Sequence, residues 1–144
     1  MGSRVQLALN VTDLGAAIEF YGKLFGAEPA KVKPGYANFA IADPPLKLVL
    51  MENGTGGSLN HLGVEVESVE AVRSATDRFA VQGFSTKAEQ GACCYAEQDK
   101  VWVSDPDGAP WEVYTVLGDA ETLSPTAGCA EGACGPQDAT AGCC

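Results

Sequence analysis

Two segments of the chain alternate apolar and polar residues with the period-2 spacing of a β-strand. The odd-numbered residues from Val5 to Val11 are all apolar, and so are the even-numbered residues from Leu62 to Val66. Alternation of this kind places every second side chain on one face of a sheet. The pattern therefore predicts two strands, over residues 5–11 and 60–66.

A helical pattern follows each predicted strand. Thr12 or Asp13 can cap a first helix that ends at Gly26, and Ser68 can cap a second helix that ends at Gly83. The predicted apolar stripes are Leu14, Ala17, Ile18, Tyr21, Leu24 and Phe25 in the first helix, and Val69, Val72, Thr76, Phe79 and Ala80 in the second.

Strand-like runs then follow both helices, at residues 36–42 and 46–51 in the first half and at residues 100–104 and 111–116 in the second. The order strand, helix, strand, strand occurs twice, and Gln6 in the first copy corresponds to His61 in the second. This is an internal repeat, which predicts two modules, residues 4–53 and 59–117. The Gly-rich segment from Asn53 to Ser58 is expected to be a flexible linker between them.

Length and composition indicate one compact domain over residues 1–117. The chain has 144 residues, 46% of them hydrophobic, and a net charge of -10, which disfavours nucleic acid and membrane partners. No apolar stretch is long enough for a leader or a membrane span, so we expect a cytoplasmic protein. In that reducing compartment the 6 cysteines are expected to be thiols.

Residues 118–144 differ in character from the rest of the chain. They are rich in Ala, Gly, Thr and Pro and carry no basic residue, so we expect a disordered tail. The tail holds four cysteines, which can supply an extra thiolate to a nearby site or belong to a dispensable extension. These are Cys129, Cys134, Cys143 and Cys144.

Candidate chemistry is concentrated in four residues. The adjacent Cys93 and Cys94 lie between the chain's single histidine, His61, and Glu112, which follows a turn signal on a predicted strand. Thiolates select soft ions, whereas an imidazole with a carboxylate suits iron, zinc or manganese. The sequence therefore predicts a soft ligand held beside a metal ion. Because successive strand side chains point to opposite faces, we expect the two cysteines to lie in a flexible loop.

The duplicated pattern and the run from Asp105 to Glu112 (DPDGAPWE) resemble the vicinal oxygen chelate superfamily over residues 4–117. That superfamily includes glyoxalase I, extradiol dioxygenases and bleomycin-resistance proteins. The segments RVQLAL, GYANFAIA, NHLGVEV, CCY and QDKVWV are more closely similar to its carbon-arsenic lyase branch and to the cadmium-inducible proteins. The resemblance implies an α+β fold in which paired βαβββ modules form a curved mixed sheet around a metal cavity.

The resemblance also implies a site. Its metal positions correspond here to Gln6, His61 and Glu112, while a fourth, near Lys47 or Leu48, offers no carboxylate. Three ligands leave open positions, as in the facial triads of Fe(II) oxygenases. Cys93 and Cys94 are then expected to bind trivalent arsenic.

The implied activity is Fe(II)- and dioxygen-dependent cleavage of the carbon-arsenic bond of trivalent methylarsenicals such as methylarsonous acid, releasing arsenite. A noncatalytic binder of cadmium or arsenite is the alternative, and drug sequestration of the bleomycin-resistance type is a third. Lys100 is interpreted as an exposed strand lysine outside the site. The aromatic residues Tyr36, Phe39, Trp102, Trp111 and Tyr114 are interpreted mainly as core.

Overall fold

The computed structural model describes residues 2–93 and 95–119. The predicted tail, apart from its first two residues, lies outside the described residues, and so do its four cysteines. The described chain divides into two compact units. The N-terminal unit is Arg4–Leu62, and the C-terminal unit contains Gly63 and the residues that follow it.

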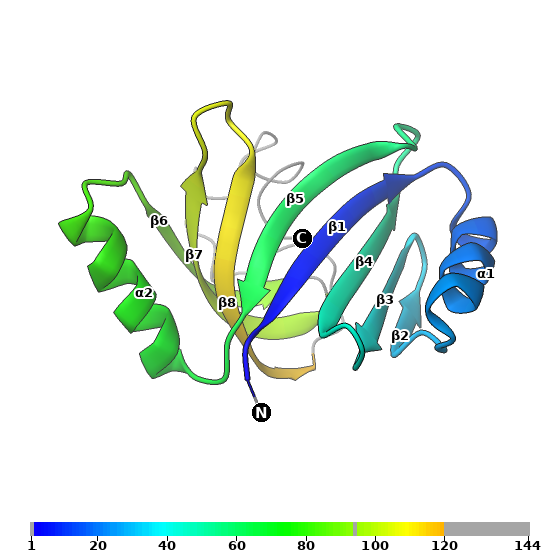
Figure 1. Ribbon diagram of the computed structural model, residues 1–144, viewed down its shortest axis with the longest axis horizontal. Coiled ribbons are helices and arrows are strands. Elements are labelled where there is room, and N and C mark those ends of the chain that lie inside the picture. The colour runs from blue at the N-terminus through cyan, green and yellow to red at the C-terminus, as the bar shows by residue number, and fades with distance from the viewer. Residues whose placement is uncertain (1, 94, 120–144) are drawn as a thin grey trace. The chain divides into compact units, whose positions relative to one another are not determined.

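The two units contain the same succession of elements (Figure 1). The N-terminal unit comprises β1 (Arg4–Val11), α1 (Leu14–Phe25), β2 (Lys31–Lys33), β3 (Tyr36–Ile41), β4 (Leu46–Glu52) and the first part of β5 (Ser58–Glu65). The C-terminal unit comprises the end of β5, α2 (Val69–Val81), β6 (Lys87–Cys93), β7 (Ala96–Ser104) and β8 (Pro110–Asp119).

Hydrogen bonding joins the strands in the order β2-β3-β4-β1-β5 in the N-terminal unit and β5-β8-β7-β6 in the C-terminal unit. β1 and β4 are parallel, whereas β2, β3 and β4 pair antiparallel, as do β6, β7 and β8. The sheet is therefore mixed, and the predicted α+β class with paired βαβββ modules is confirmed. β2 and β6 were not predicted, because one is three residues long and the other lacks large apolar side chains.

The helices begin where the sequence predicts. Asp13 caps α1 by accepting a hydrogen bond from the amide of Ala16, and Ser68 does the same for the amide of Ala71 in α2. Gly26, in the left-handed conformation, ends α1. None of the helices among the described residues has the length and apolar character that spanning a bilayer requires.

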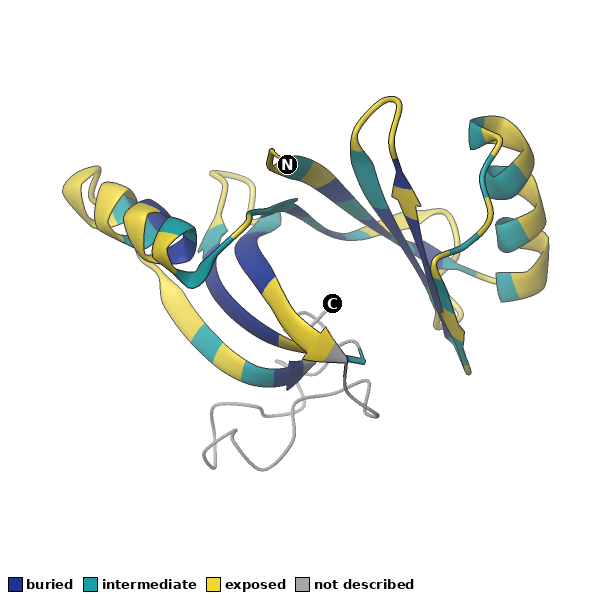
Figure 2. Cartoon of the chain, turned by 90° about the horizontal axis from the view of Figure 1, so that it is seen from below, coloured by how far each residue is buried: buried dark blue, intermediate teal, exposed yellow. Residues whose placement is uncertain are grey.

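Each helix covers one face of its own unit's strands. In the N-terminal unit the core is formed by four buried residues, Phe39, Ile41, Leu48 and Leu50. Most of the predicted α1 stripe packs against them, but the inclusion of Leu24 was wrong, because 58% of its surface is exposed. In the C-terminal unit the core cluster is Val72, Ala75, Val101 and Val113. Figure 2 shows the buried residues concentrated on strands, with exposed residues on the helices.

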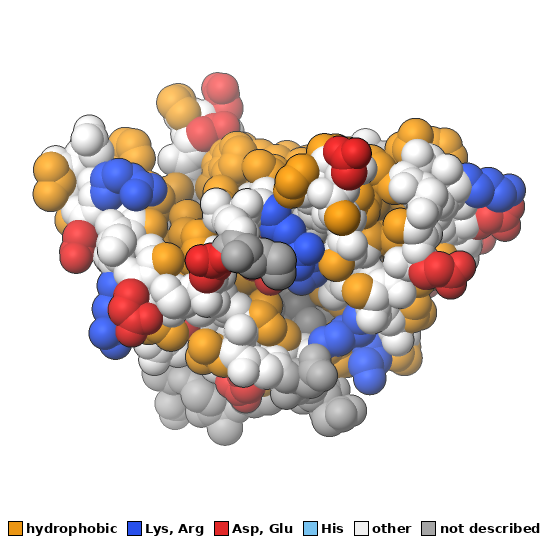
Figure 3. Space-filling model, turned by 60° about the horizontal axis from the view of Figure 1, so that its bottom comes forward, with side chains coloured by type: hydrophobic (Ala, Val, Ile, Leu, Met, Phe, Trp, Pro, Cys, Tyr) orange, Lys and Arg blue, Asp and Glu red, His pale blue; other side chains and the backbone are white. Residues whose placement is uncertain are grey.

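Of the five aromatic residues interpreted mainly as core, four are buried. Tyr36, Phe39, Trp102 and Tyr114 are at most 8% exposed, whereas Trp111 is only partly buried. On the face drawn in Figure 3, acidic and basic side chains are interspersed with hydrophobic ones. Charges of both signs so close together weaken the field at that face.

The segment from Asn53 to Ser58, expected to be a flexible linker, is instead fixed to the end of β1. The amide of Gly57 donates to the carbonyl of Asn10, and the amide of Asn53 donates to that of Val11. A Cβ atom placed on Gly56 would lie 2.6 Å from the backbone nitrogen of Thr12. The segment therefore belongs to the packed part of the N-terminal unit.

We predict that Gly56→Ala lowers the free energy of unfolding by about 1–3 kcal/mol, because the new methyl group overlaps the backbone at Thr12. Gly15→Ala is the matched control. Its Cβ meets only the Asp13 carboxylate, at 3.5 Å, so replacing this helical glycine should add about 0.5–1 kcal/mol. Urea unfolding measures both changes, and equal stability of the two variants would contradict the docking of the segment.

Candidate metal centre

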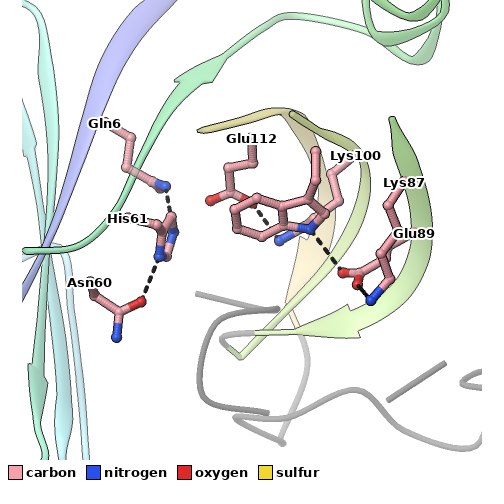
Figure 4. Close-up of polar contacts among 8 residues, drawn as sticks. Gln6, Asn60, His61, Lys87, Glu89, Lys100 and Glu112 are labelled. Carbon is pink, nitrogen blue, oxygen red and sulfur yellow. Dashed lines mark hydrogen bonds and ion pairs between the residues drawn. The ribbon is translucent and has the colours of Figure 1, made fainter. Parts of the chain in front are cut away.

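His61 lies on β5 with its imidazole fully buried in the N-terminal unit. Its Nδ1 atom is 2.8 Å from Oδ1 of Asn60, and its Nε2 atom is 3.2 Å from the side-chain amide nitrogen of Gln6 on β1 (Figure 4). Gln6 is only 4% exposed. Two of the three predicted metal ligands are thus adjacent, with their polar atoms facing one another.

A network of asparagine side chains determines which nitrogen of His61 carries the proton. The amide nitrogens of Asn60 and Asn53 both donate to Oδ1 of Asn10, at 2.9 and 2.5 Å. The amide nitrogen of Asn10 donates in turn to the hydroxyl of Ser58 at 2.9 Å. Since Asn60 uses its nitrogen for Asn10, its oxygen is the atom that faces His61 and must accept a hydrogen bond.

The proton of the neutral imidazole therefore resides on Nδ1, and Nε2 keeps its lone pair toward Gln6. An unprotonated Nε2 with a hydrogen-bonded Nδ1 is the arrangement found in histidines that bind metals. The Gln6 amide nitrogen, 3.2 Å away, faces that lone pair and can donate to it. A half-turn of the amide would replace the nitrogen by its oxygen, which is the atom that ligates a metal.

The spacing of the two side chains also suits a shared ion. Bonds of about 2.1 Å from a metal to nitrogen and oxygen place two neighbouring ligand atoms at a right angle about 3 Å apart. The polar atoms of Gln6 and His61 are 3.2 Å apart. The residues present therefore fit two adjacent positions of a metal's coordination sphere.

The third predicted ligand, Glu112, lies on β8 in the C-terminal unit and is 2% exposed. Its carboxylate is 2.7 Å from the ammonium group of Lys100 on β7, whose side chain is equally buried. The interpretation of Lys100 as an exposed lysine was wrong. The sequence of β7 does not predict the burial of Lys100. A buried lysine requires a partner, and only the pairing of β7 with β8 reveals it.

Aromatic rings and a second carboxylate surround this ion pair. The Lys100 ammonium lies 5.5 Å from the ring centre of Trp102 and 5.7 Å from that of Tyr114. The indole nitrogen of Trp102 donates to Glu89, and Glu89 also pairs with Lys87 at 3.3 Å. Low exposure and aromatic walls reduce the screening of these charges by water.

Cys93 is the last residue of β6, and its backbone pairs with Ala96 at the start of β7. Tyr95 has a φ of 61°, in the left-handed region that β-strands do not use. The backbone thus leaves extended geometry at Tyr95, whereas Cys93, expected in a flexible loop, ends a paired strand. Cys94 and the side chain of Cys93 lie outside the described part of the structure, and their role as arsenic ligands stays a prediction.

Sequence reasoning missed Lys100 and the polar residues that orient His61. Asn10 and Asn60 gave a faint signal, because asparagine is disfavoured in strands and Asn60 directly precedes His61. Within residues 2–93 and 95–119 no three His, Cys, Asp or Glu side chains form a metal-binding cluster. The predicted ligand set contains only two residues of those types, with an amide as the third.

The chain belongs to the Glyoxalase/Bleomycin resistance protein/Dioxygenase superfamily, whose family model matches residues 4–113. The resemblance inferred from the sequence, and with it the vicinal oxygen chelate fold, is confirmed. Within the family the chain is 68% identical over 123 residues to the cadmium-induced protein CadI of Mycobacterium tuberculosis, covering 84% of this chain and 81% of that protein.

A second group of relatives has a different name. The chain is 63% identical over 126 residues to the trivalent organoarsenical cleaving enzyme of Thermomonospora curvata, covering 85% of this chain and 83% of that enzyme. Among solved structures, the Mn(II)-bound glyoxalase of Novosphingobium aromaticivorans matches with a TM-score of 0.59 at 19% identity, over 85% of this chain and 43% of its own. At that identity the likeness shows the fold alone.

We predict that Asn60→Ala weakens the binding of Mn²⁺ by about 10–100-fold, because it removes the acceptor that fixes the tautomer of His61. Asn53→Ala is the matched control, since it deletes a bond to the same Asn10 oxygen without touching His61. Its effect should stay within about threefold. Electron paramagnetic resonance of free Mn²⁺ measures both affinities, and equal losses would show that Asn60 acts only through the network.

Proposed function

We propose that this protein is an Fe(II)- and dioxygen-dependent lyase that cleaves the carbon-arsenic bond of trivalent methylarsenicals, such as methylarsonous acid, and releases arsenite. The observation that carries the proposal is the buried Gln6–His61 pair, with Nε2 of His61 unprotonated by the hydrogen-bond network. The name of the Thermomonospora curvata relative indicates the substrate class.

In this proposal Gln6, His61 and Glu112 hold the metal ion. The mixed set of amide oxygen, imidazole nitrogen and carboxylate suits a divalent ion of intermediate hardness, and ferrous iron is one. Glu112 supports the assignment because its buried carboxylate, now paired with Lys100, would keep a positive partner if a metal ion replaced the ammonium. Three protein ligands would leave coordination positions on ferrous iron free for dioxygen.

Cys93 and Cys94 are proposed to bind the arsenic atom. Trivalent arsenic is soft and exchanges readily onto thiolates, whereas pentavalent arsenicals present hard oxygens and no free position. Two adjacent thiolates would fix the arsenic and so orient its organic group. Holding the substrate in this way converts an encounter between dilute species into an effectively unimolecular step.

The second candidate is a noncatalytic protein that sequesters cadmium or arsenite. The name of the Mycobacterium tuberculosis relative, a cadmium-induced protein, favours it. Such a binder would use the paired thiols and has no need of an oriented imidazole. The hydrogen bonds that fix the tautomer of His61, from Asn60 to Asn10 and from His61 to Asn60, support catalysis instead.

One incubation separates the two candidates. Pure protein is mixed with Fe(II), a reductant and methylarsonous acid, in air and under argon, and the arsenic species are then separated by chromatography. The lyase releases arsenite in air only. Release of no arsenite in either atmosphere, with methylarsonous acid bound to the protein, would favour the binder.

We predict that metal binding and arsenic binding can be abolished separately by different substitutions. Cys93→Ser and Cys94→Ser should abolish arsenite release, because one hydroxyl replaces a thiolate, and leave the affinity for Mn²⁺ unchanged. His61→Ala and Glu112→Ala should lose Mn²⁺ and activity yet still bind methylarsonous acid. Loss of Mn²⁺ in the serine variants would contradict two separate sets of ligands.

A further inference from the structure

We propose that Lys100 is a placeholder for the metal ion: its ammonium group neutralises Glu112 while the metal is absent and lowers the affinity of the protein for divalent cations. The inference rests on the proposed function, because it takes Glu112 as a metal ligand. It assigns a role to a residue outside the predicted ligand set.

The need for a placeholder follows from burial. Both side chains are 2% exposed, so water cannot solvate either charge effectively. A buried carboxylate without a positive partner is strongly destabilising. Lys100, 2.7 Å away, supplies a positive charge. A metal ion at Glu112 would supply the same charge, and the two positive groups would then repel each other across a poorly screened site.

Lys100 also has a second set of contacts that can hold its charge. The faces of Trp102 and Tyr114 lie within 5.7 Å of the ammonium, close enough for cation–π attraction. Glu89 is directly opposite Lys100 in the pairing of β6 with β7. If a metal ion took over Glu112, the two ring faces would still hold the buried ammonium.

This arrangement would couple metal binding at Glu112 to the folding stability of the protein. The ion pair balances the charge of Glu112 when no metal is bound, and the cost is competition between the ammonium and the incoming cation. Removing the ammonium should therefore have two opposite effects: a less stable metal-free protein and a tighter metal complex. A purely structural lysine would produce only the first effect.

The test uses the full chain and Mn²⁺, which binds thiolates weakly and therefore avoids the cysteines. Lys100→Met, which keeps the length of the side chain, should bind Mn²⁺ at least tenfold more tightly than the wild type. The rise in melting temperature at saturating Mn²⁺ should also be larger in the variant, because ligand binding adds stability in proportion to the logarithm of affinity. Lys100→Gln, neutral but able to donate a hydrogen bond, serves if the methionine variant does not fold.

Lys23→Met is the matched control. It makes the same substitution in an exposed pair, where Lys23 and Glu19 are 77% and 70% exposed, and should change Mn²⁺ affinity less than twofold. Unchanged or weaker binding in both Lys100 variants would overturn the placeholder role and leave the proposed function standing. If Glu112→Gln does not weaken Mn²⁺ binding in the wild type, Glu112 is not a ligand, and both proposals fail.

Discussion

The hydrogen bond from Nδ1 of His61 to Asn60 is the interaction on which the candidate site depends. A buried neutral imidazole can carry its proton on either nitrogen, and only one choice leaves Nε2 free for a metal. The choice is made by a chain of amides that runs from Asn60 through Asn10 to Ser58. The same amides attach the segment after β4 to β1, so the packing of that segment and the chemistry of His61 share one set of bonds.

The two units differ in the charge of their buried polar groups. In the N-terminal unit the buried groups around His61 are neutral, and each amide in the chain satisfies the next. In the C-terminal unit they are charged, and Lys100 balances Glu112 among aromatic rings. The neutral groups orient the lone pair of His61, whereas the charged groups add long-range attraction or repulsion toward an ion.

Much of the fold could be predicted from the sequence because the signals are local. Asp13 and Ser68 mark the helix starts, and alternation marks β1 and β5. The repeat gave Gln6 and His61 as equivalent positions, and the structure brings their side chains together on neighbouring strands. The exposure of Lys100 was predicted wrongly because its burial depends on the pairing of β7 with β8. The burial of Leu24 was predicted wrongly because α1 has more apolar residues than the face that packs on the strands can hold. The family resemblance, not spacing, supplied Gln6 as a candidate ligand and arsenic as the ion bound by the cysteine pair.

The central claim, that His61 presents an unprotonated Nε2 to a metal ion, can be measured directly because the chain has a single histidine. Protein labelled with ¹⁵N-histidine gives one imidazole in a long-range ¹H–¹⁵N spectrum. We predict a protonated Nδ1 and an unprotonated Nε2 without metal, and on addition of Zn²⁺ a large shift of Nε2 while Nδ1 keeps its proton. A proton on Nε2, or an Nε2 resonance that does not respond to Zn²⁺, would contradict the account.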